Sequence, residues 1–146
     1  MSAAGLPVFD ETVHLTNAWL KDLMTELGWD DRHRAYLALR LTLQALRDQL
    51  TVESAADLGA QLPMLVRGFY YEGWRPSQAP GEERGKGEFL ERVHKGFRQG
   101  PADEVIDAES VVRAVFKLLS ERLSPGEAEK TRNKLRKGMR ALWPEA

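Results

Sequence analysis

The sequence predicts an all-α fold made of a duplicated helical unit, and two observations lead to this prediction. Apolar side chains recur every three or four residues along most of the chain, and no segment shows the period-two alternation of a strand. Residues 15–73 also align without a gap on residues 88–146. We therefore expect two repeats of about four helices each, packed as a compact bundle with pseudo-twofold symmetry.

The alignment of the two repeats rests on small, apolar and basic positions of the predicted helices. Identical pairs include Ala35 with Ala108, Arg40 with Arg113, Leu46 with Leu119, Leu50 with Leu123, Ala55 with Ala128, Leu62 with Leu135 and Arg67 with Arg140. Leu43 aligns with Phe116, and we expect these two side chains in equivalent core positions of long helices related by a near twofold rotation. A difference between the repeats is not required by the shared scaffold.

The first repeat, residues 10–73, follows a flexible tail at residues 1–9 and contains four predicted helices. The first helix spans Asp10–Leu27, because its apolar side chains form one stripe and Gly28 favours a helix end. Asp30 is a good N-cap for a long helix at residues 31–50. Thr51 then caps a short helix. Pro63 suits the first turn of a fourth helix, which runs to about residue 72.

The second repeat, residues 88–146, follows a linker at residues 74–87 that is rich in Gly, Pro and charged residues. Its predicted helices span residues 88–99, a stretch that begins between residues 103 and 107 and ends near Leu123, and a last helix from Ser124 to Trp143. Pro125 takes the first helical position of that last helix. Thr131, Leu135, Met139 and Leu142 form its predicted core stripe.

Composition excludes several classes of site. The 146 residues suffice for one domain with its own core. Cysteine is absent, which excludes disulfides, thiolate metal sites and thiol nucleophiles, and fits a reducing compartment. No segment resembles a signal peptide or is long enough to span a bilayer, so we expect a cytoplasmic protein without membrane contact. His14, His33 and His94 lie in separate elements, without metal-ligand spacing.

No recognised catalytic motif occurs: the chain has no HExxH sequence, phosphate-binding glycine loop or G-x-S-x-G turn. We assign no catalytic residue, metal ion or cofactor, and we favour a non-enzymatic function. The two halves differ in charge, since acidic residues outnumber basic ones in the first and basic residues outnumber acidic ones in the second. This difference directs attention to features that occur in one repeat only.

The first such feature is an aromatic segment that is apolar on nearly all sides of its predicted helix. A helix of this kind must be buried on more than one face, either in its own molecule or against a partner. One interpretation is that Tyr70, Tyr71 and Trp74 fill the seam between the repeats. The functional interpretation is a surface that binds a protein partner or a second copy of the chain. Its candidate residues are Met64, Tyr70, Tyr71, Trp74 and Arg75.

The second feature is a basic stretch on the last predicted helix, formed by Lys130, Arg132, Lys134, Arg136, Lys137 and Arg140. Only Arg140 has a basic counterpart in the first repeat. A solvated face with charges near a helix C-terminus is one explanation. The alternative function is binding of nucleic acid or another polyanion. A third hypothesis is a small-molecule pocket between the repeats, lined by Trp29, Tyr36 or Tyr70.

The chain resembles a bacterial family of conserved, uncharacterised proteins, the domain of unknown function 2267. The similarity lies in TNAWLKDLMTELGWDDRHRAYLALRLTLQALRDQL, in LPMLVRGFYYEGW, and in VVRAVFKLLSERLSPGEAEKTRNKLRKGMRALW. This resemblance implies a duplicated helical domain and no known activity, cofactor or catalytic residue. Many relatives have a second Leu-Pro like Leu62-Pro63. Here Arg136 follows Leu135, so we expect the last helix to continue without a break.

Overall fold

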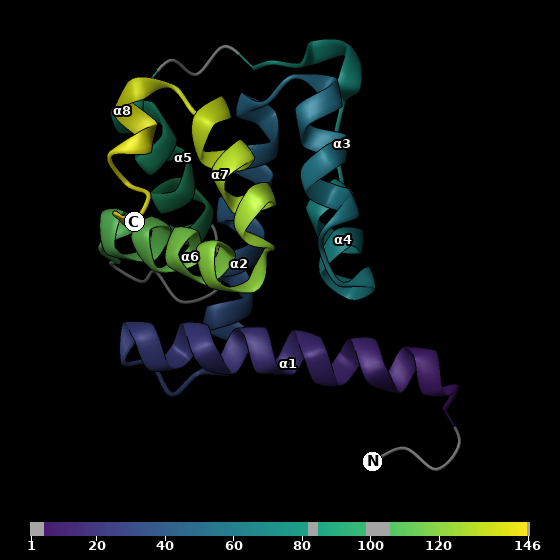
Figure 1. Cartoon of the computed structure of the whole chain (residues 1–146). Helices are drawn as coiled ribbons and strands as arrows, with labels where there is room; N and C mark the ends of the chain where they lie inside the picture. Colours follow the sequence, from purple (N-terminus) through teal and green to yellow (C-terminus); the bar gives the residue numbers. More distant parts are fainter. Residues whose placement is uncertain (1–4, 82–84, 99–105, 146) are drawn as a thin grey trace.

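The computed structural model describes residues 5–81, 85–98 and 106–145, and these residues form an all-α structure without strands. Short turns connect the first four α-helices to one another and the last three to one another, and a linker precedes the fifth (Figure 1). In chain order the helices are α1 (Pro7–Leu27), α2 (Arg32–Gln49), α3 (Val52–Ala60), α4 (Met64–Tyr71), the 3-10 turn η1 (Pro76–Gln78), α5 (Lys86–Arg98), α6 (Ala108–Arg122), α7 (Pro125–Lys134) and α8 (Lys137–Arg140).

The core lies around α2 and α6, whose apolar faces are fully enclosed. Leu43 on α2 and Phe116 on α6 are both completely buried, as expected. The near twofold rotation between the two helices stays a prediction. α1 crosses one end of the bundle, and its C-terminal half buries Trp19 and Leu23 in contact with α2 and α6 (Figure 1). Its N-terminal half extends past α6 toward α4.

Capping residues define the helix ends much as the sequence predicted. Gly28 ends α1 with a left-handed φ of 68°, a conformation that favours glycine. Thr51 accepts a hydrogen bond from the Ser54 backbone N–H, and Ser124 accepts one from Glu127. The cap of α2 is Asp31 rather than Asp30, because the Asp31 carboxylate accepts hydrogen bonds from the first turn.

The first helix begins earlier than expected. Its first residue is Pro7, not Asp10, so residues 7–9 belong to α1 and not to a tail. Proline favours the first helical position because its missing N–H would have no helical partner there. The extra turn carries Val8 and Phe9, both exposed.

The prediction of an uninterrupted last helix is wrong. α7 ends at Lys134, the backbone is extended at Leu135 and Arg136, and α8 begins at Lys137. After the break, α8 lies beside α5 (Figure 1), where Gly138 faces Lys86 and Met139 is fully buried. Trp143, which follows α8, contacts Phe116 on α6. The core packing therefore breaks the helix without a proline, and all four residues of the predicted core stripe are still buried.

The first part of the linker contains a short helical turn and a backbone contact to α2. Residues 76–78 form η1, and the Gly81 backbone N–H donates to the carbonyl of Asp48 on α2, with an N to O distance of 2.6 Å. Within the predicted linker, residues 82–84 lie outside the described residues. Gln99, the predicted end of one helix, and residues 103–105, where the next helix was expected to begin, also lie outside the described residues. Asp107 is described, and it caps α6.

Candidate functional site: an apolar groove between α1 and α4

The predicted aromatic segment is divided among different environments. The Tyr70 side chain is completely buried, and its hydroxyl donates to the Ala55 carbonyl at 2.7 Å. Burial raises the pKa of this phenol well above its usual range. Tyr71 and Trp74 are half-buried, while Met64 and Arg75 are exposed. The five residues therefore do not form one surface, and Tyr70 belongs to the core.

The Tyr71 ring lies between α3 and α4. Its ring covers Gly59 so closely that a Cβ added at Gly59 would overlap the ring. Trp74 stacks on the same ring, with the two centroids 5.3 Å apart. The face of α4 that carries Tyr71 therefore packs against α3. The aromatic residues are partly buried within the molecule, as the seam-filling interpretation expects, but Tyr71 packs between two helices of the first repeat.

Side chains of α2 hold the C-terminal end of α4. Arg47 is 4% exposed, and its Nη1 donates to the carbonyls of Tyr70 at 2.8 Å and Glu72 at 2.9 Å. Gln44 donates to the Phe69 carbonyl at 2.8 Å. The last carbonyls of a helix lack intrahelical partners, so these donors supply what the helix itself cannot. The position of α4 is thus fixed from α2.

The opposite face of α4 and the N-terminal half of α1 enclose an apolar groove of about 860 Å³. Its lining residues are Phe9, Thr12, Val13, Thr16, Asn17, Leu20, Arg32, His33, Tyr36, Met64, Leu65, Gly68, Phe69 and Glu72. The Leu65 backbone N–H donates to Thr12 Oγ1 at 3.0 Å, which joins the first turn of α4 to α1. We call this feature the α1–α4 groove.

Large apolar side chains in the groove are open to solvent. Phe9 is 54% exposed, Val13 46%, Met64 48% and Leu65 44%. Two other lining residues are partly buried and pack on each other: the Tyr36 ring meets the Phe69 ring edge-on, with the ring centroids 5.3 Å apart. Exposed apolar patches bordered by polar residues mark interaction sites more often than isolated apolar residues do.

One end of the groove is polar. Arg32 and His33, at the start of α2, lie at this end, and Arg32 Nη1 donates to Asn17 Oδ1 on α1 at 3.1 Å. The Thr16 hydroxyl also lines the groove; it is buried and has no hydrogen-bond partner among the described residues. Specific sites commonly combine an apolar surface with a few polar groups that fix the orientation of the ligand.

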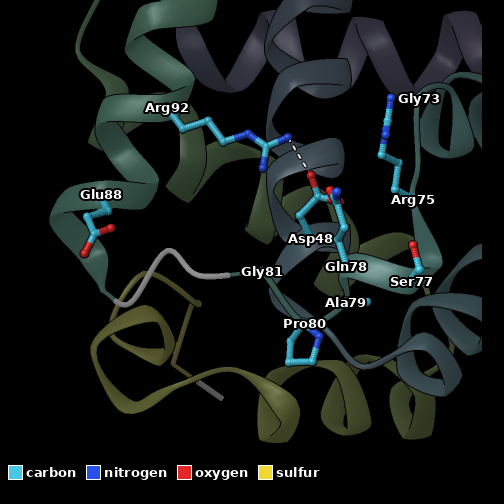
Figure 2. A pocket seen from close by; sticks show the side chains of 10 residues that line it. All are labelled: Asp48, Gly73, Arg75, Ser77, Gln78, Ala79, Pro80, Gly81, Glu88 and Arg92. Atoms are coloured by element: carbon cyan, nitrogen blue, oxygen red, sulfur yellow. Dashed lines mark ion pairs between the residues drawn. The ribbon is translucent and has the colours of Figure 1, made fainter.

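A second hollow lies beside the linker and is polar (Figure 2). It encloses about 980 Å³. Arg92 reaches from α5 toward Asp48 and pairs with its carboxylate at 2.7 Å, and Arg75 extends on the linker side. Partial burial raises the pKa of Asp48, but hydrogen bonds from Arg47 and Arg92 outweigh this effect and hold the pKa below its usual value.

The aromatic residues of the small-molecule hypothesis are not brought together. Tyr70 is in the core and Tyr36 lines the α1–α4 groove. Trp29 packs against Phe97 on α5, and the Arg34 guanidinium lies 4.1 Å from the centre of the Trp29 ring. None of these three aromatic residues lines the polar hollow.

The basic residues of the polyanion hypothesis lie on two short helices instead of one. Lys130, Arg132 and Lys134 are exposed on α7, and Lys137 and Arg140 on α8, with half-buried Arg136 between them. The hollow between α3 and α7 brings Asp57 and Glu127 close to Lys130 and Lys134. Acidic side chains therefore share part of this surface, and polyanion binding stays a prediction.

The described residues contain no cluster of three or more His, Asp or Glu side chains that could hold a metal ion. None of the helices in the described ranges combines the length and the apolar character needed to cross a bilayer.

Most of the groove was not predicted from the sequence. Met64 and Tyr36 were candidate residues, but residues 1–9 were expected to form a tail, so Phe9 was not a candidate. The available signal was Pro7, a favourable first helical residue, followed by apolar side chains at helical spacing. Leu65 lies at helical spacing from the buried Leu62, yet it is 44% exposed.

Comparisons with known proteins give a family and no activity. A family model described as "Uncharacterized conserved protein (DUF2267)" matches residues 16–142 of the chain. The resemblance seen in the sequence is thereby confirmed. No curated protein matches the chain.

Proposed function

Because the chain belongs to this family of uncharacterised conserved proteins, which supplies no activity, we propose a function from the geometry: the protein is an interaction module. Its α1–α4 groove receives the apolar face of a helix. One observation carries this proposal. Among the described residues, the large apolar side chains that are exposed lie on α4 or on the first turns of α1 and the residue before it, with Val52 as the exception.

The dimensions of the groove fit a helix. Its lining runs along α1 from Phe9 to Leu20, which at 1.5 Å per residue is a length of roughly 16 Å, or about three helical turns. Amphipathic helices bind such grooves through side chains spaced three and four residues apart. The four exposed apolar residues of the groove provide the matching surface.

A comparison of the two halves of the chain supports the proposal. We propose that the halves are true repeats with an offset of 73 residues; the caps Thr51 and Ser124 occupy aligned positions. With that offset, Met64 and Leu65 align with Lys137 and Gly138. In the second repeat, a charged residue and a glycine thus stand at the positions of these two apolar side chains. The scaffold does not require exposed apolar side chains there, which favours binding as the reason for them.

The proposal modifies the sequence-based hypothesis. The aromatic segment remains the candidate binding element, but its contacting residues are Met64 and Leu65 on one face of α4. Tyr70, Tyr71 and Trp74 support that helix from behind. Arg75 lies at the polar hollow, away from the groove.

Site-specific photo-crosslinking tests this function. A photoreactive amino acid at Leu65 would lie inside the groove, whereas the same amino acid at Val52, which is 43% exposed, serves as a matched control outside it. In cells that naturally express the chain, we expect an adduct at position 65 whose cross-linked peptide belongs to an amphipathic helix. Adduct formation no greater at Leu65 than at Val52 would refute a docking role for the groove.

A further inference from the structure

We infer that the occupant of the α1–α4 groove is the N-terminal half of α1 from a second copy of this chain, running antiparallel. This inference rests on the proposed function and identifies the partner. In the resulting twofold dimer, the two α1 helices lie side by side and each is also flanked by the α4 of the other copy. Three observations support this arrangement.

The first observation is a heptad pattern along α1. Apolar or small residues alternate at spacings of three and four: Leu6, Phe9, Val13, Thr16, Leu20, Leu23 and Leu27. This is the spacing of a seam between two packed helices. The C-terminal part of the seam is covered within the molecule, where Leu20 and Leu23 are buried. The N-terminal part is not, since Leu6, Phe9 and Val13 are all exposed.

The second observation is that the same residues belong both to the seam and to the groove. Phe9 and Val13 line the groove, and they are also the side chains that α1 would insert into a partner. A twofold interface requires this property, because the same patch must act as both donor and acceptor of side chains. If the groove bound an unrelated helix, the α1 side chains that line it would not also need to suit binding in the same groove of another copy.

The third observation is the distribution of charge. Asp10 flanks the seam at the N-terminal end of α1, while Arg32 and His33 lie at the opposite end of the groove. An antiparallel arrangement brings Asp10 of the second copy toward Arg32 and His33. A parallel arrangement would place acidic ends together. Rim charges of this kind select orientation more than they add affinity.

Sedimentation velocity on the full chain tests the dimer. We expect the wild-type chain to form a dimer over the micromolar range, Val13→Asp to lose it, and Val52→Asp to retain it. Val52 is a matched control for Val13, because the two side chains are 43% and 46% exposed and both lie on helices. Circular dichroism of both variants checks that the helical content is unchanged. A monomeric wild type, or a Val13→Asp variant that still dimerises, overturns the inference.

Disulfide trapping tests the orientation, and the absence of cysteine from the chain makes each introduced thiol unique. Val13 lines the groove and would lie near the twofold axis, whereas Leu6 precedes α1 and lies about two helical turns farther from the axis. We expect Val13→Cys to form covalent dimers and Leu6→Cys to form no more than Val52→Cys, the control for random collisions. Equal trapping at Leu6 and Val13 would indicate a parallel pair and would contradict the antiparallel inference.

The two proposals can fail separately. If the chain is monomeric but Leu65 cross-links to an amphipathic helix of another protein, the second-copy inference is wrong and the docking function stands. If the Leu65 adduct is a second copy of the chain and depends on Val13, both hold. If position 65 yields no more adduct than position 52, the docking function fails.

Discussion

Replacing Arg47 by methionine should cost far more stability than the same replacement at Arg67. Each arginine donates to two backbone carbonyls: Arg47 to those of Tyr70 and Glu72, and Arg67 to those of Gly59 and Leu62. The difference is burial, because Arg47 is 4% exposed and Arg67 is an exposed residue. Arg47 also pairs with the Asp48 carboxylate, so the two replacements compare a buried, ion-paired guanidinium with an exposed one that makes the same kind of backbone contact.

The magnitude follows from what each substitution leaves behind. Arg47→Met leaves buried carbonyls without donors and the Asp48 carboxylate with only its remaining partners. Loss of one member of a buried ionic network costs about 3–5 kcal/mol. Water can replace Arg67, so its loss should cost about 1 kcal/mol. For a chain of this size these values correspond to a fall in Tm of about 10 °C or more and of about 3 °C.

Urea unfolding followed by far-ultraviolet circular dichroism measures both free energies of unfolding. The slope of free energy against urea should not change, so that the shift in midpoint reports stability and not a change in the surface exposed. Similar losses in the two variants, both near 1 kcal/mol, would refute the argument that the buried guanidinium organises the end of α4.

Two further predictions concern α4 and its surroundings. Gly59→Ala should destabilise the fold by about 1–3 kcal/mol, because the added methyl group overlaps the Tyr71 ring. Gly68→Ala should stabilise α4 by about 0.5–1 kcal/mol, because its methyl group meets no atom within 4 Å and alanine favours a helix over glycine. The urea midpoints of the two variants measure both effects. Because the pKa of Asp48 is lowered in the folded state, its stabilising effect is complete above the unfolded pKa of about 4 and is lost as the pH falls through the folded pKa. The difference in unfolding free energy between wild type and Asp48→Asn should therefore be constant from about pH 7 to pH 5 and shrink below about pH 4, as measured by urea titrations at each pH.

Much of the fold was predictable because local signals determine it. Gly28, Thr51 and Ser124 mark helix boundaries through backbone geometry and side-chain hydrogen bonds, and neither depends on distant residues. The break after Lys134 was not predictable in this way. Leu135 and Arg136 are extended because tertiary packing turns α8 onto the core, and that packing has no local signature.

The candidate site was only partly predictable for a related reason. Helical periodicity indicates which residues share a face, but it does not say how far the neighbouring helix extends. Tyr70 and Met64 both lie in an apolar stretch, yet one is completely buried and the other is 48% exposed. The difference arises because α3 covers the back of α4, while nothing among the described residues covers the side that faces α1.

The two walls of the groove differ in how firmly they are held. α4 has only eight residues, too few to be stable as an isolated helix, and it is kept in place by buried contacts with α2 and α3. The N-terminal turns of α1 have fewer such contacts, and the hydrogen bond from Leu65 to Thr12 is among them. A docking helix therefore meets one wall held by several buried contacts and one held by few. Substitutions that favour the helical state of residues 7–13 should tighten binding without adding a single contact, because they reduce the entropy that association costs.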